Sequence, residues 1–344
     1  MTFAGNLDIP NLSKVTDMSY MFYGCSSFNQ PLEEWNVNNV TNMHYMFEGC
    51  SSFNQPLEKW DVSKVFDIRQ MFYGCTAFNQ PLEKWDVSKV TNMTEMFRGC
   101  TAFNQPLEGW DVSKVTNMYE MFRGCTAFNQ PLEKWDVSKV TYMPYMFYGC
   151  ISFNQPLEKW DVSKVIHSEL MFAYCRSFNQ PLGGWKLNIP IMGLPSTAMS
   201  PTNYSKSLDG WANQTEGANN IWFGDLVRGL IYNDLGKAAR DKLIARGWTF
   251  EGDIYQASGV AITPNPLYLV QGTESVLNVE KWGVEESESI SLSCDQNGLL
   301  SYTLAPDGKS IRVKGLSVGK CNLTATIAAK EGVHQAYVGS CQVQ

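Results

Sequence analysis

Apolar side chains return along this chain at positions that repeat every 25 residues. The string Phe-Asn-Gln-Pro-Leu begins at Phe28, Phe53, Phe78, Phe103, Phe128, Phe153 and Phe178. A Trp lies seven residues after each of these Phe residues, and a Cys lies three residues before it. Self-similarity at a fixed period of this length is the signature of a stacked-repeat architecture.

Within the repeat 103–127, the first apolar group predicts a short strand. Leu107, Trp110 and Val112 follow the strand pattern of leucine-rich repeats, with Trp in the place of the middle Leu. These three side chains are expected to point inward, and the residues between them are expected to face solvent.

The second apolar group predicts a helix of about two turns over 117–124. Asn117 is a good N-cap residue, and Met118, Met121 and Phe122 have the i, i+3, i+4 spacing of one helical face. Gly124 stands where a left-handed C-cap residue is wanted. A helix this short is unstable alone, so neighbouring repeats must hold it.

Each repeat exposes apolar surface on both sides until it is stacked. Nine inward positions recur, which in this repeat are Phe103, Leu107, Trp110, Val112, Val115, Met118, Met121, Phe122 and Cys125. Stacking buries them in one continuous core. The recurring Asn104 and Gln105 are expected to hydrogen-bond turn backbone and each other from repeat to repeat. We therefore expect an α/β solenoid over residues 1–185, a leucine-rich-repeat-like stack with short strands and short helices.

The end of the stack needs a cap, which we place at 186–254. Ser200-Pro201 is a helix start, 237–246 has the pattern of a second helix, and Trp248–Phe250 is typical of a short strand. Residues 259–344 change character to short alternating runs separated by Gly, Pro and Asp turns. The alternation predicts an all-β Ig-like sandwich, with strands at 289–294, 310–314, 321–328 and 336–343.

Composition and charge exclude some functions. The apolar fraction is 44% and the charged fraction 18%, as in folded proteins, and the net charge is −7. Nucleic acid and anionic membranes attract basic surfaces, so neither is expected as a partner. No apolar run is long enough to insert into a membrane, and no signal peptide is visible at the N-terminus.

The repeats resemble those of BspA-like leucine-rich repeat surface proteins. The motif Phe128-Asn-Gln-Pro-Leu-Glu-Lys-Trp-Asp-Val-Ser-Lys-Val carries the resemblance, together with Met146-Phe147 and Gly149-Cys150. The cap resembles theirs from Ser200-Pro201 to Trp248-Thr249, and the tail is similar to bacterial Ig-like domains. The family implies a right-handed solenoid, a secreted or cell-surface location and a link to adhesion, with no catalytic residues. Its members normally carry an export signal, so either the N-terminus has been removed or this member is unusual.

The cysteines fall into two groups. The repeat cysteines lie on the apolar side, and neighbours are expected to stand about 4.8 Å apart, too far for disulfide geometry. We expect buried thiols, and the alternative of a zinc ladder lacks converging histidines. In the tail, Cys321 and Cys341 share the parity of inward residues and could face each other across a final hairpin. A disulfide between them and separate thiols are both open, and Cys294 is left over.

Two surfaces are candidates for contact. Columns of Glu, Lys and Asp on the expected strand face are either self-neutralising or a striped surface for a charged partner or calcium. Tyr119, Tyr142, Tyr145 and Tyr148 fall in or beside the expected helices and form our candidate contact patch, because Tyr is favoured at interfaces. The alternative is that these tyrosines only cover the edges of the repeats.

No catalytic fingerprint, cofactor motif or metal-ligand spacing stands out, and His44, His167 and His334 are isolated along the chain. We therefore expect no enzyme, no cofactor and no metal. Two hypotheses remain. One is an extracellular or surface-exposed adhesion module that binds a protein or glycan ligand. The other is a structural subunit in contact with neighbouring subunits of a surface or virion assembly.

Overall fold

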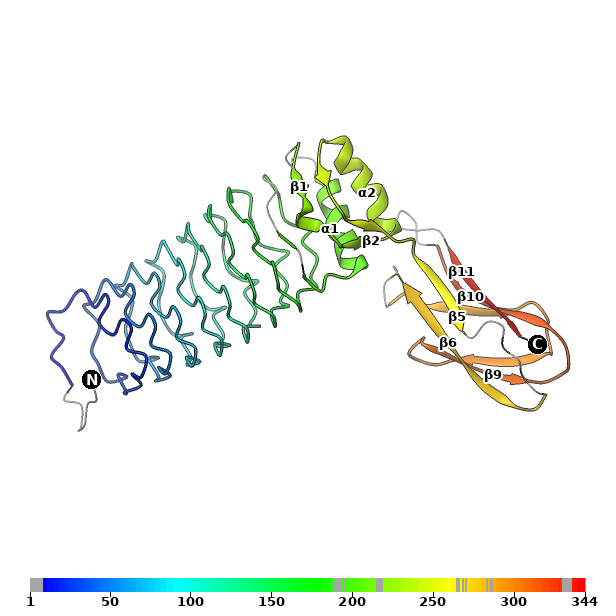
Figure 1. Ribbon diagram of the computed structural model, residues 1–344, viewed down its shortest axis with the longest axis horizontal. Helices are drawn as coiled ribbons and strands as arrows, with labels where there is room; N and C mark the ends of the chain where they lie inside the picture. Colours follow the sequence, from blue (N-terminus) through cyan, green and yellow to red (C-terminus); the bar gives the residue numbers. More distant parts are fainter. Residues whose placement is uncertain are drawn as a thin grey trace.

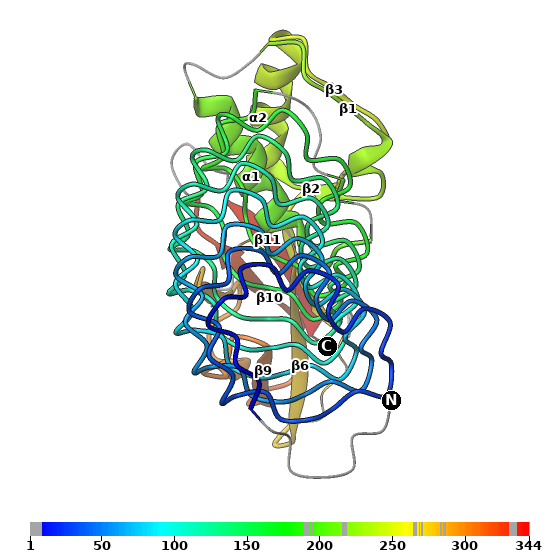
Figure 2. The same ribbon diagram turned by 90° about the vertical axis from the view of Figure 1, so that its left-hand side faces the viewer.

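The structure, a computed structural model, describes residues 9–188, 193–194, 196–214, 219–263, 267, 269, 271–282, 284, 287–329 and 336–343. The start of the expected first domain, before residue 9, lies outside this range. The described residues form three parts that follow one another along the molecule: a stack of repeats, a unit with two helices, and two β-sheets (Figure 1). Viewed from the N-terminal end, the successive repeats lie one behind another (Figure 2).

Tight turns replace the predicted strand in each repeat. In the repeat 103–127 the Trp110 N–H donates to the Leu107 carbonyl at 3.0 Å, and the Val115 N–H donates to the Val112 carbonyl at 2.9 Å. The first and last residues of each turn, Leu107 with Trp110 and Val112 with Val115, are all buried. The prediction of a strand over 107–112 is therefore wrong, because apolar residues three apart mark the two ends of a turn here.

The predicted helix over 117–124 is also wrong. Glu120 has a φ of 52°, which lies outside the right-handed helical region. Every second N–H group of this segment therefore points out of its own repeat and bonds to a carbonyl of the next repeat. The donors are Met118, Glu120, Phe122 and Gly124, and their acceptors are the carbonyls of Tyr142, Pro144, Met146 and Tyr148, at 2.8, 3.0, 3.0 and 2.8 Å. We call this parallel pairing, which recurs between successive repeats, the inter-repeat ladder.

The inward residues are as predicted. All nine inward side chains of the repeat 103–127 are buried, none of them more than 3% exposed. Phenylalanine rings stack from repeat to repeat, with 5.7 Å between the Phe97 and Phe122 centroids and 6.0 Å between those of Phe103 and Phe128. The core is thus one column that runs through the repeats into the cap.

Buried polar groups also find partners one repeat away. The Asn104 N–H donates to the Asn79 Oδ1 atom at 2.9 Å, and the Gln105 Nε2 atom donates to the same oxygen at 3.1 Å. The Trp135 indole N–H donates to the Leu107 carbonyl at 2.9 Å. The predicted amide ladder is therefore confirmed, and it satisfies groups that would be costly to bury alone.

The helical unit continues the same contacts and closes the stack. Ser200 caps the first helix and Pro201 begins it, as the sequence predicts. The Trp211 indole N–H donates to the Leu182 carbonyl at 2.8 Å. This helix therefore continues the kind of bond that Trp135 makes to Leu107 within the stack. The elements are α1 (Pro201–Asn213), β1 (Trp222–Gly224), a 3-10 turn (Asp225–Val227), β2 (Ile231–Tyr232), α2 (Asp234–Ala245), β3 (Thr249–Phe250) and β4 (Ile254–Tyr255). Strands β1 and β3 pair in parallel, and so do β2 and β4.

The C-terminal region is rich in sheet and has its own core. Its strands are β5 (Gly259–Thr263), β6 (Glu274–Trp282), β7 (Ile290–Cys294), β8 (Leu300–Leu304), β9 (Ser310–Gly315), β10 (Cys321–Ile327) and β11 (Tyr337–Val343). One sheet has the order β11-β10-β7 and the other β5-β6-β9-β8, with antiparallel pairs throughout. The four predicted strands correspond to β7, β9, β10 and β11, whereas β5, β6 and β8 were not predicted.

The helical unit is tied to this region through Asp234 at the start of α2. Its carboxylate accepts hydrogen bonds from the Tyr337 hydroxyl on β11 and from the Ser258 N–H, the latter at 3.2 Å.

Among the described residues, no helix combines the length and the apolar character that crossing a bilayer requires.

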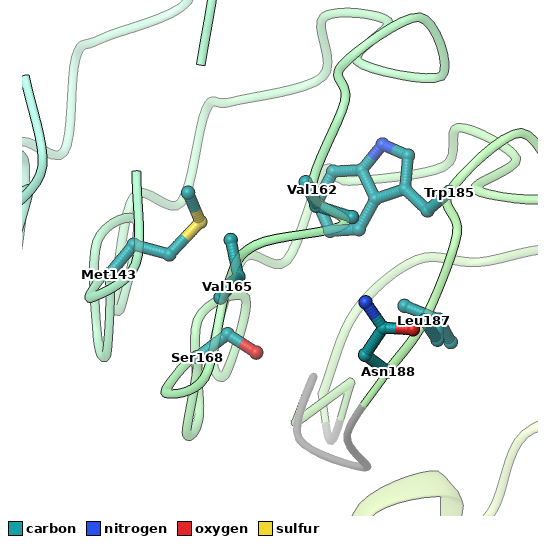
Figure 3. A pocket seen from close by; sticks show the side chains of 7 residues that line it. All are labelled: Met143, Val162, Val165, Ser168, Trp185, Leu187 and Asn188. Carbon is teal, nitrogen blue, oxygen red and sulfur yellow. The ribbon is translucent and has the colours of Figure 1, made fainter. Parts of the chain in front are cut away.

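A gap in the core marks the place where the repeat pattern fades. Earlier repeats place Met or Ile at the position occupied by Ser168, such as Met118 and Met143, and these side chains are buried. Ser168 borders a cavity of about 10 Å³, room for about one water molecule, beside Val165 and Trp185 (Figure 3).

We expect Ser168→Met to fill this gap and raise stability by about 1 kcal/mol, because it restores an apolar side chain that the other repeats bury. Thermal melting followed by circular dichroism measures the effect. The matched control is Met143→Ser, which opens the same gap one repeat earlier and should lower stability by about 2–5 kcal/mol. A lower melting temperature for Ser168→Met would show that the gap cannot accept the side chain.

Candidate binding surface

Differences between repeats concentrate at four positions, while the core and turn positions hardly change. We call the surface made by these positions the variable strip. Its residues are Asp17, Ser19, Tyr20 and Tyr23 in the first repeat, then Asn42, His44, Tyr45, Glu48, Asp67, Arg69, Gln70, Tyr73, Asn92, Thr94, Glu95, Arg98, Asn117, Tyr119, Glu120, Arg123, Tyr142, Pro144, Tyr145, Tyr148, His167, Glu169, Leu170 and Ala173.

The inter-repeat ladder positions this strip. The four positions lie in or beside the laddered segment, so side chains of successive repeats stand next to one another. One of them has a left-handed backbone in every repeat, with φ between 50° and 59°, and this position holds Tyr20, Tyr45, Gln70, Glu95, Glu120, Tyr145 and Leu170. Glycine adopts this conformation most easily, yet each repeat places a large side chain there. The repeat gains a ladder bond at this position, such as the one from the Glu120 N–H to the Pro144 carbonyl at 3.0 Å.

The structure brings together all four tyrosines of the predicted contact patch. The ring centroids of Tyr119 and Tyr142 are 5.8 Å apart, those of Tyr119 and Tyr145 6.4 Å, and those of Tyr145 and Tyr148 5.9 Å. Each tyrosine is half-buried, so each combines a supported ring with an accessible edge. Tyr174 extends the cluster, at 5.2 Å from Tyr148.

A second aromatic cluster lies at the other end of the strip. Tyr20 stacks on Tyr45 with 4.7 Å between centroids, and His44 meets both rings edge-on at 5.0 and 5.2 Å. Tyr23 packs against Tyr20 at 5.6 Å. The sequence contained the signal for this cluster, because its tyrosines have the same positions in the repeat as Tyr145 and Tyr148. The predicted contact patch, centred on Tyr142–Tyr148, does not include this cluster.

Charged side chains occupy the strip between the two aromatic clusters. Glu120 is only 1% exposed, and its carboxylate lies between two arginines: Arg98 Nη1 is 2.5 Å from Oε2, and Arg123 Nη1 is 2.7 Å from Oε1. The Arg123 guanidinium also lies over the Tyr148 ring, at 4.8 Å from its centroid. A hydrogen bond to Glu120, together with burial, raises the pKa of Tyr119 to about 12, so its hydroxyl remains a donor at neutral pH.

The strip also contains buried side-chain oxygens that accept no hydrogen bond from the described residues. The buried oxygens Glu48 Oε2, Gln70 Oε1 and Glu169 Oε2 have no hydrogen-bond partner among the described residues. Burial, with a smaller contribution from Glu95, raises the pKa of Glu48. Buried polar groups are normally satisfied, so these three oxygens are exceptions among the described residues of the strip.

The other predicted surface neutralises itself. Lysines bond to the glutamates of the preceding repeat, with 2.9 Å between Lys134 Nζ and Glu108 Oε2 and 3.0 Å between Lys84 Nζ and Glu58 Oε1. Ser113 bonds to Asp111, and these hydrogen bonds lower the pKa of the aspartate. The charges of this surface are therefore engaged within the stack, in agreement with the self-neutralising alternative.

The repeat thiols are packed as apolar groups. Cys125 is fully buried, its Sγ donates to the Phe97 carbonyl at 2.9 Å, and burial raises its pKa. Cys175 shows the same pattern with a pKa of about 12. Thiols with such pKa values are poor nucleophiles and poor metal ligands at neutral pH. Cys25, in the first repeat, is exposed.

The tail cysteines are thiols in the structure. The register places Cys321 opposite Val343 and Cys341 opposite Leu323, so the predicted partners share a face of the sheet but stand one diagonal step apart. The expected face-to-face arrangement is not found, and a Cys321–Cys341 disulfide stays a prediction. Of the three histidines, His44 and His167 lie on the variable strip, and His334 lies outside the described residues.

We expect Glu120→Gln to destabilise the protein by about 3 kcal/mol, because it removes the buried carboxylate that both arginines share, while Arg98 keeps only its second partner Glu95 at 3.1 Å. Urea unfolding followed by tryptophan fluorescence measures the change. The matched control is Glu108→Gln, whose partner Lys134 is 77% exposed, and its effect should stay below about 1 kcal/mol. Equal effects of the two substitutions would contradict the buried network.

Comparisons with known proteins agree with the repeat architecture. The family model described as "Mycoplasma protein of unknown function, DUF285" matches residues 1–110 and 91–211. No curated protein matches the chain, and no solved structure matches it. The two matched segments share the 25-residue repeats and together span more than half of the chain, so this protein belongs to the DUF285 family.

Proposed function

We propose that this protein is a non-catalytic binding protein displayed outside a cell or on another surface, and that the variable strip is its contact surface. In this proposal the repeats form a right-handed solenoid of the BspA-like kind, which acts as a rigid scaffold. The C-terminal sheets act as an Ig-like module beside it.

The observation that carries the proposal is the contrast between strip and scaffold. Core, turn and charged-column positions hardly change between repeats, whereas the strip differs in nearly every repeat. A stack needs identical neighbours for packing, but it needs nothing varied on its surface. Variation restricted to one side is the arrangement expected of a recognition surface built on a constant frame.

The chemistry of the strip suits a protein or glycan ligand. Half-buried tyrosines offer large contact area with little conformational entropy to lose. A net charge of −7 disfavours nucleic acid.

Ligands are first selected with the full chain from a glycan array and a peptide-display library. We expect the combined substitutions Tyr142→Ser, Tyr145→Ser and Tyr148→Ser to weaken binding of the selected ligands at least about tenfold, because they remove aromatic anchors. The control combines Glu133→Ser, Lys134→Ser and Lys159→Ser on the charged columns, and it should bind as the unaltered chain does. Unchanged binding by the tyrosine variant, with folding verified by circular dichroism, would refute the assignment of the strip.

A further inference from the structure

Two of the tail cysteines approach each other across neighbouring strands. In the pairing of β7 with β10, Cys294 lies directly opposite Leu323. Cys321 is two residues before Leu323, so its side chain is on the same face of the sheet. The Sγ atoms of Cys294 and Cys321 lie within 4.8 Å of each other, in a group that also includes a carboxylate oxygen of Asp295.

The surroundings favour a bond between the two sulfurs over a bound metal ion. The Asp295 carboxylate is already held by Asn322, at 2.7 Å from the backbone nitrogen and 2.7 Å from the side-chain nitrogen. It is therefore anchored to β10 and poorly placed to turn toward a metal. The Cys294 Sγ donates a weak hydrogen bond to the Gln296 carbonyl at 3.4 Å, and a thiolate gives up this bond when it loses its proton.

The two thiols differ in access. Cys294 is half-buried, at the end of its strand, whereas Cys321 is 4% exposed. Cys341 flanks Leu323 from β11 on the other side and is fully buried. A small oxidant therefore reaches Cys294 first, and Cys321 is the nearby thiol that can complete the reaction.

We propose that Cys294 and Cys321 form a disulfide on exposure to an oxidising thiol–disulfide buffer. The Cys294 thiolate attacks oxidised glutathione, which forms a mixed disulfide and releases one glutathione thiolate. Cys321, deprotonated as it reacts, then attacks the Cys294 sulfur and releases the second. Two protein thiols are oxidised, one glutathione disulfide is reduced to two glutathione thiols, and the two protons pass to these products.

The bond would join two neighbouring strands of one sheet and close a loop that passes through the other sheet. The segment from Cys294 to Cys321 leaves the β11-β10-β7 sheet, supplies β8 and β9 to the other sheet, and returns at β10. Closing this loop removes freedom from the unfolded chain while linking neighbouring strands of the folded one. The oxidised tail is therefore more stable than the reduced tail, and this holds whether or not the variable strip binds a ligand.

The test uses the full chain treated with oxidised glutathione, then trypsin without reductant. The sequence places the three tail cysteines on separate tryptic peptides, 282–309, 321–330 and 331–344. We expect mass spectrometry to find 282–309 joined to 321–330, with 331–344 unlinked. We also expect the melting temperature of the tail to rise by several degrees on oxidation.

Single cysteine substitutions test which two thiols form the bond. Cys341→Ser should leave the cross-link and the melting shift intact, while Cys294→Ser and Cys321→Ser should remove both. A cross-link between 321–330 and 331–344 would overturn the proposal in favour of the hairpin pair. Stable glutathione adducts without a cross-link would overturn it as well, and so would one tightly held Zn²⁺ per reduced chain that is lost in Cys294→Ser.

Discussion

The inter-repeat ladder is the interaction on which the rest of the stack depends. Each repeat is a succession of tight turns with few bonds of its own, so alone it would expose both its backbone and its apolar side chains. The alternate N–H groups of one laddered segment bond to the carbonyls of the next, from Met18 to the repeat that begins at Phe153. This pairing fixes the register at 25 residues, and the fixed register allows each Phe, Trp and Asn to meet its own copy.

The same ladder explains why variation is confined to one side. A residue in the left-handed region, such as Glu120 or Gln70, interrupts any helix and turns successive N–H groups toward the neighbouring repeat. Its side chain lies outside the apolar core of the stack, and different repeats accommodate different side chains there. The scaffold tolerates the unfavourable backbone since it gains a backbone bond at each of these positions, so varied chemistry can be placed on a regular frame.

The sequence was sufficient for the period, the inward residues, the amide ladder and the tyrosine cluster, since all of these follow from position in the repeat. It was insufficient for the local backbone. Met118, Met121 and Phe122 have the spacing of a helical face, but apolar residues three and four apart also mark the ends of tight turns. Only the left-handed residue at Glu120 distinguishes the two, and that position holds Tyr, Gln, Glu or Leu, none of which signals positive φ.

The chain holds its thiols in two different situations, and the difference follows from strand geometry. In the stack, each Cys occupies the same place in its repeat, and from Cys50 to Cys175 its Sγ bonds to a carbonyl of the preceding repeat, as Cys125 does with Phe97. Regular stacking therefore keeps neighbouring thiols engaged and apart. In the tail, antiparallel pairing offsets Cys294 and Cys321 diagonally across two strands, which brings their sulfurs close without a shared carbonyl. A solvent oxidant can therefore act on the tail pair while the buried stack thiols stay protected by their packing.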